Sequence, residues 1–145
     1  MKAIATRRSG TPGEMTVEER PVPARRPGQT LVRVRTATIN QLANSLRTGA
    51  FGSLPAPIVL GNEGAGTVEE SAILPAGTRV AVHGHGDMGV TIDGLYQQYV
   101  TVPDQRLLPL PPPSTGPKAP PSPSTTSPPT SPSPTPPTYS AGRPS

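Results

Sequence analysis

The sequence predicts a mainly β domain over residues 1–110 with one short helix, followed by a disordered tail over residues 111–145. Strand-like segments recur along the first part of the chain, separated by turn residues roughly every 8–12 positions, which is typical of a small barrel or sandwich. Only the stretch at residues 40–47 has leucines four positions apart, the spacing that places them on one face of a helix. The tail holds 14 Pro, 8 Ser and 6 Thr in 35 positions, so it has almost no apolar surface whose burial could offset the entropy of ordering.

The strands follow from alternation and from turn residues. Segments 2–6 and 15–18 flank a turn-rich stretch at 9–13, so we expect them to pair as a hairpin. The prolines in 19–28 favour an extended connector. The clearest strand is 30–38, in which Val32, Val34 and Thr36 alternate with Arg33 and Arg35, as on a strand with one buried face. The other expected strands lie within 57–70, around a glycine-rich corner, and at 79–83, 95–102 and 107–110.

The helix is expected over residues 40–47. Leu42 and Leu46 are four positions apart, so they share one helical face. Gly49 follows and is a typical residue for ending a helix. Asn40 precedes the helix, where it is a candidate N-cap.

Composition excludes several classes of site and partner. The chain has no Cys, which excludes disulfides, thiolate zinc sites, iron–sulfur clusters and a cysteine nucleophile. No apolar run approaches the ~20 residues that cross a bilayer, and the first residues lack a secretory signal. We therefore expect a cytoplasmic protein with no membrane contact. The net charge of +4 is mild and its basic residues are scattered, so no nucleic acid partner is expected.

Three local patterns have both a functional and a structural interpretation. Residues 84–89 match G-x-G-x-x-G, but β-branched residues follow instead of a helix, which favours a mobile hairpin loop over a phosphate-binding loop. Residues 61–66 predict a tight corner, where Glu63 is either a buried acid accepting backbone amides or a site residue. His83 and His85 would share one face of a strand, and two solvent-facing histidines are favoured over a metal pair.

Seven groups of residues occur in the order and spacing of one known family. They are MKAI at 1–4, ERPVP at 19–23, LVRVR at 31–35, IN at 39–40 with LRTG at 46–49, LP at 54–55 with LGNEGAGTV at 60–68, AGTRV at 76–80 and GLYQQYV at 94–100. Together they resemble the N-terminal GroES-like domain of medium-chain dehydrogenases/reductases, of the zinc-independent quinone oxidoreductase type. The resemblance implies a GroES-like partial barrel.

The same resemblance implies a function and a set of cleft residues. The zinc-dependent branch has a Cys early in the helix and a His before the corner Glu, whereas this chain has no Cys and has Asn62 at the His position. No metal is therefore expected. The implied reaction is NADPH-dependent reduction of a quinone, an enone or a similar small carbonyl substrate. Asn40, Phe51, Asn62 and Glu63 would line the cleft, and no catalytic residue is assigned.

The family continues with a Rossmann domain that grips the dinucleotide, and nothing in these 145 residues can be that domain. We therefore expect the chain to be inactive alone and to bind no NADPH tightly. A domain built to pack on a partner domain exposes an apolar face when alone, which favours self-association.

Two interpretations of residues 111–145 stay open. From residue 113 onward almost every residue has codons with C or G at the second base, as a shifted frame of a GC-rich gene would produce. A Rossmann glycine motif in another frame of the downstream DNA would support this frameshift. Alternatively the segment is a genuine proline-rich arm, and the chain is a non-catalytic binding or scaffold module.

Overall fold

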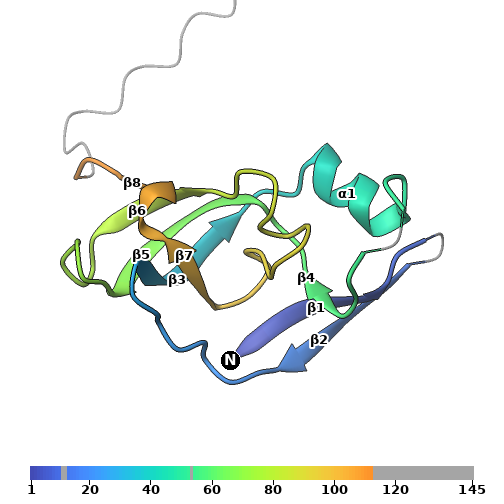
Figure 1. The fold of residues 1–145 in the computed structure, drawn as a ribbon, viewed down its shortest axis with the longest axis horizontal. Coiled ribbons are helices and arrows are strands. Elements are labelled where there is room, and N and C mark those ends of the chain that lie inside the picture. The colour runs from blue at the N-terminus through green and yellow to red at the C-terminus, as the bar shows by residue number, and fades with distance from the viewer. Residues whose placement is uncertain (11–12, 53, 113–145) are drawn as a thin grey trace, which may run out of the picture. The chain divides into compact units, whose positions relative to one another are not determined.

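A computed structural model describes residues 1–10, 13–52 and 54–112, which form two antiparallel sheets and one α-helix (Figure 1). The elements in chain order are β1 (Lys2–Arg8), β2 (Glu14–Glu19), β3 (Gln29–Ala37), α1 (Gln41–Thr48), β4 (Ile58–Val59), β5 (Glu63–Glu70), β6 (Arg79–His83), β7 (Tyr99–Pro103), the 3-10 turn η1 (Asp104–Arg106) and β8 (Leu107–Pro109). The prediction of a mainly β fold with one short helix is confirmed.

The smaller sheet has the strand order β2-β1-β4. β1 and β2 pair antiparallel, with Ile4 opposite Val17, so the expected hairpin is confirmed. Residues 11 and 12 of the expected turn lie outside the described residues. β4 adds only two residues to the other edge of β1.

The larger sheet has the order β7-β3-β5-β6-β8 and is antiparallel throughout. Its centre depends on a close approach of β5 to β3. A Cβ atom built on Gly66 would lie 2.4 Å from the carbonyl oxygen of Arg33 and 2.6 Å from a methyl carbon of Val32. The glycines of the corner motif are therefore required because the two backbones pass too closely for a side chain.

The main core lies against one face of the larger sheet. Its buried members are Val32, Val68, Val80, Val82, Met88, Leu95, Val100, Val102 and Leu107. A second cluster joins the helix to the smaller sheet through Leu46, Ile58 and Leu60, with Leu42 and Tyr96 packed against it. The leucine pair predicted to share a helical face therefore does pack on one side of α1.

Two details of the expected strands are wrong. The strand predicted at 95–102 begins only at Tyr99, because the preceding residues cross between the sheets instead. In that crossing the amide of Ile4 donates to the carbonyl of Tyr96, and the amide of Val34 donates to the carbonyl of Gln98. Thr36 is exposed instead of sharing the buried face with Val32, because the pairing of β3 with β5 changes register between Val34 and Thr36.

Both ends of α1 follow the sequence prediction. Oδ1 of Asn40 accepts the backbone amide of Ala43 at 3.0 Å, which is an N-cap. Gly49 is left-handed, with φ of 80°, and its amide reaches back to the carbonyl of Leu46.

The tail is predicted to be disordered over residues 111–145 and to follow a shifted reading frame from residue 113; residues 113–145 lie outside the described residues. Within the described part of the chain, no helix has the length and apolar character that a membrane span requires.

Candidate functional site

Three of the four predicted cleft residues meet at the corner between β4 and β5. Nδ2 of Asn40 donates to Oδ1 of Asn62 at 3.0 Å and lies 3.5 Å from Oε2 of Glu63. Asn40 precedes α1, whereas the other two follow Gly61 at the start of β5. Residues some twenty positions apart in the sequence are thus joined in one polar cluster, the Asn40–Asn62–Glu63 cluster.

The corner is shaped by Gly61, whose φ is 96°. A Cβ atom there would lie 2.6 Å from the ring of Tyr96, so a glycine lets the chain turn beneath the aromatic ring. The turn places Asn62 in the interior, where its side chain is almost fully enclosed. Its backbone carbonyl accepts the amide of Gly84 at 2.7 Å, which fixes the residue's position against the end of β6.

Glu63 is partly exposed and accepts no backbone amide among the described hydrogen bonds, so the interpretation as a buried structural acid is wrong. Its role as a site residue stays a prediction. Its other oxygen, Oε1, lies 3.5 Å from Nδ1 of His83, which stands opposite it in the β5–β6 register. The rings of His83 and His85 are 4.8 Å apart, edge to face. The sequence could not reveal the contact of Glu63 with His83, because it depends on strand register.

Phe51 does not join the cluster. It follows the C-terminal end of α1, whereas Asn40 caps the N-terminal end. An eight-residue helix is about 12 Å long, and the Phe51 side chain is exposed. Its predicted place in the cleft stays a prediction.

The cluster does not fit a catalytic zinc. Zinc sites use Cys, His or carboxylate ligands, whereas two of the three residues here are amides and their facing atoms are hydrogen-bonded to each other. The described residues contain no group of three His, Cys, Asp or Glu side chains placed to hold a metal ion.

The glycine motif at 84–89 is a structural loop. The described chain continues from it through turns, without the helix that a dinucleotide-binding loop requires. Met88 is fully buried in the main core, and Asp87 forms a two-pronged ion pair with Arg106, with Nη2 to Oδ2 at 2.9 Å. The hydrogen bonds from Arg106 lower the pKa of Asp87 below its ordinary value.

Comparison with known proteins identifies the fold. Residues 26–112 match the family described as the alcohol dehydrogenase GroES-like domain. The chain belongs to this family. The predicted GroES-like fold and the membership of the medium-chain dehydrogenases/reductases are thereby confirmed.

This GroES-like domain has relatives of both alcohol and quinone type. It is 31% identical over 113 residues to a zinc-type alcohol dehydrogenase-like protein of Schizosaccharomyces pombe, with 77% of this chain and 35% of that protein covered. A thermostable alcohol dehydrogenase of Pyrobaculum aerophilum matches with a TM-score of 0.68 and 27% identity, over 75% of this chain and 40% of that one. The quinone oxidoreductase of Thermus thermophilus, solved also with NADPH, matches with a TM-score of 0.59 and 28% identity, over 77% and 32%.

The chain thus spans about a third of the length of the Schizosaccharomyces pombe relative. Because both classes of enzyme occur among the structural neighbours, the zinc-independent quinone oxidoreductase subtype stays a prediction.

Asn40 serves two purposes that substitution can separate. Asn40→Ala removes both the N-cap and the donor to Asn62, and we expect it to lower the free energy of unfolding by about 1–2 kcal/mol. Asn40→Ser keeps a capping oxygen and should recover most of that loss. Urea denaturation measures both. Asn44→Ala, on an exposed position of the same helix, is the control and should change stability by less than about 0.5 kcal/mol. Equal losses for Asn40→Ala and Asn40→Ser would contradict the capping role.

Because of the Asp87–Arg106 pair, the stability of the domain should depend on pH in the acidic range. Because the folded-state pKa of Asp87 is lowered, its contribution is fully present above the unfolded pKa of about 3.9 and is lost as pH falls through the lower folded value. Asp87→Asn should therefore destabilise the domain at pH 7, and the difference from wild type should shrink in strongly acidic buffer. Thermal melts from pH 7 to pH 2 measure it. A difference that stays constant down to pH 2 would show that the ion pair is not its source.

Proposed function

We propose that this domain forms the substrate-side wall of the cleft in an NADPH-dependent quinone or enone reductase. The observation that carries the proposal is the Asn40–Asn62–Glu63 cluster, which offers amide donors where the zinc-dependent branch of the family holds a metal ligand. A carbonyl-conjugated substrate needs its oxygen polarised as hydride arrives, and fixed hydrogen-bond donors do this without a metal ion.

Asn62 is the donor best placed for that task. Oδ1 of Asn40 is committed to the helix cap, and its Nδ2 to Asn62. Oδ1 of Asn62 accepts that bond, while the hydrogen bonds among the described residues include none donated by its Nδ2. The amide of Asn62 is thus held in one orientation with its N–H groups uncommitted. Glu63 supports the arrangement by accepting from Asn40.

NADPH supplies the hydride when it is bound. The residues described here do not fit the dinucleotide, because the loop at 84–89 leads into no helix and Met88 fills the core. We therefore propose that NADPH is bound by a second domain, of the kind that the longer relatives have outside the part matched by this chain. The chain alone should bind no NADPH tightly and reduce no quinone.

A chimera tests the proposal. Residues 1–112 replace the matching N-terminal domain of the Thermus thermophilus quinone oxidoreductase, and NADPH-dependent reduction of 1,4-benzoquinone and of an enone is measured. We expect activity in the chimera, and a loss of roughly 100-fold in kcat on Asn62→Ala, because one fixed donor to the developing oxyanion is removed. The 145-residue chain alone is the negative control.

The control substitution in the chimera is Asn44→Ala, which removes the same atoms from an exposed site and should leave kcat unchanged. A chimera that binds NADPH but reduces neither substrate would overturn the proposed reaction. An unchanged kcat in the Asn62→Ala chimera would overturn only the role of the Asn62 amide and would leave the proposed reaction standing.

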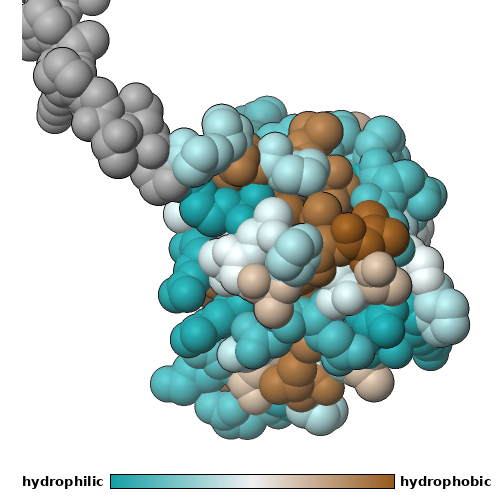
Figure 2. Space-filling model, turned by 90° about the vertical axis from the view of Figure 1, so that its left-hand side faces the viewer, coloured by the Kyte–Doolittle hydropathy of each residue, from teal (hydrophilic) through white to brown (hydrophobic). Residues whose placement is uncertain are grey.

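We also propose that the isolated chain self-associates through exposed apolar side chains. Figure 2 shows apolar residues at the surface of one face of the domain, set among hydrophilic ones. Phe51 and Leu108 are 69% and 63% exposed, so both offer apolar surface whose burial between two copies would favour association.

Sedimentation velocity at rising concentration should show an increasing average mass for the wild-type chain. Phe51→Ser combined with Leu108→Ser should reduce that increase, because it removes apolar surface, whereas Gln41→Ser should not. A wild-type chain that stays monomeric at the highest concentration would contradict self-association.

A further inference from the structure

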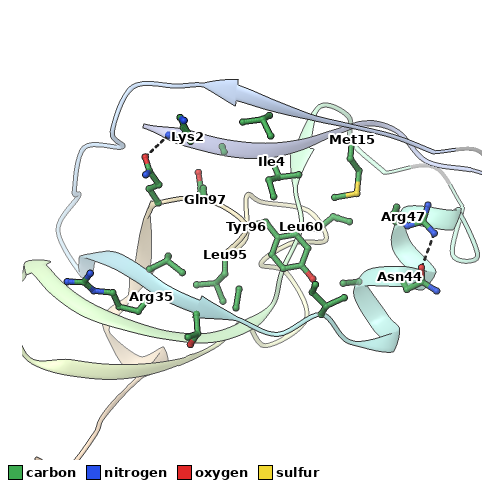
Figure 3. A pocket seen from close by; sticks show the side chains of 18 residues that line it. Lys2, Ile4, Met15, Arg35, Asn44, Arg47, Leu60, Leu95, Tyr96 and Gln97 are labelled. Atoms are coloured by element: carbon green, nitrogen blue, oxygen red, sulfur yellow. Dashed lines mark hydrogen bonds between the residues drawn. The ribbon is translucent and has the colours of Figure 1, made fainter.

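An open groove of about 660 Å³ runs between the two sheets and the helix (Figure 3). Its outer wall is formed by Ile4 of β1 and by Met15 and Val17 of β2. Its floor is formed by Leu60, Leu95 and Tyr96. The volume lies within the range of ligand cavities in proteins, roughly 300–1,000 Å³.

The groove has a buried apolar floor and an exposed apolar rim. Leu60 and Leu95 are only 1% exposed, whereas Ile4 is 40% and Val17 is 70% exposed. The hydroxyl of Tyr96 donates to the carbonyl of Thr38, which directs its polar end away and leaves the ring as part of the floor. An occupant with an aliphatic body would bury the exposed rim as well as its own surface.

The charges around the groove all have one sign. Lys2, Arg35 and Arg47 line it, and no Asp or Glu does. None of the three takes part in the ion pairs found among the described residues. The residues outside the described part of the chain contain no Asp or Glu at all.

Two of these cations lie at the same end of the groove. The amide of Gln98 donates to the carbonyl of Lys2, and the carbonyl of Gln98 accepts the amide of Val34, which precedes Arg35. Figure 3 shows Lys2 and Arg35 at one end and Arg47, hydrogen-bonded to Asn44, at the other. An anionic group between Lys2 and Arg35 would gain from both charges.

We propose that this groove binds a monoanionic amphiphile, a fatty carboxylate, with its carboxylate between Lys2 and Arg35 and its aliphatic chain along the floor toward Met15 and Leu60. The groove shares none of its lining residues with the Asn40–Asn62–Glu63 cluster. The proposed binding therefore uses none of the three side chains to which the proposed reductase function is assigned.

Calorimetric titration of the full chain with dodecanoate, below its micellar concentration, tests the proposal. We expect saturable binding with one site per chain. Octanoate should bind at least tenfold more weakly, because it has four fewer methylene groups to bury in the groove. Dodecyltrimethylammonium, with the same tail and the opposite charge, should bind roughly tenfold more weakly than dodecanoate. Equal binding of the two amphiphiles by the wild-type chain would overturn the charge selection.

Charge reversal locates the carboxylate. Lys2→Glu combined with Arg35→Glu should weaken dodecanoate roughly tenfold, whereas Arg79→Glu, an exposed cation of β6 that does not line the groove, should leave it unchanged. Unchanged binding in the double variant would overturn the proposed orientation. Absence of dodecanoate binding would overturn the proposal. If Val17→Ser then also abolishes self-association, the occupant of the groove is a second copy of the chain.

Discussion

The close approach of β5 to β3 is the constraint from which the rest of this domain follows. Gly64 and Gly66 let the two backbones pass where a Cβ atom would lie within 2.4 Å of a carbonyl oxygen of β3. Because β3 also pairs with β7, this contact sets the centre of the larger sheet. It also fixes where β5 begins, and so places Asn62 and Glu63 beside the cap of the helix. The position of the candidate site is therefore set mainly by the packing of the β3 and β5 backbones.

Local patterns in the sequence were enough to predict most of the strands, the helix and its two caps. Alternation in β3, leucine spacing in α1 and the glycine after it are all decided by nearest neighbours along the chain. Contacts between distant segments were not accessible. The bulge that exposes Thr36 and the contact of Glu63 with His83 depend on the register of β5 against its neighbours. The residues of the candidate cluster were predicted from a family resemblance, but their hydrogen bonds needed the fold.

Two surfaces of different chemistry follow from one scaffold. The corner cluster is polar, with its amides held by one another and by a helix cap. The groove is apolar and bordered by unpaired cations among the described residues. The two surfaces adjoin each other, because Tyr96 lies on the groove floor and also packs against Gly61 of the corner.

The crossing segment at residues 95–98 gives the domain a mechanical property. The carbonyl of Tyr96 and the amide of Gln98 are hydrogen-bonded to β1, and the carbonyl of Gln98 is hydrogen-bonded to β3. These main-chain hydrogen bonds link the two sheets, so the sheets cannot move apart without breaking them. The span between the sheets is therefore fixed by the polypeptide backbone, and evolution of the lining side chains can change the depth and polarity of the space but hardly its width.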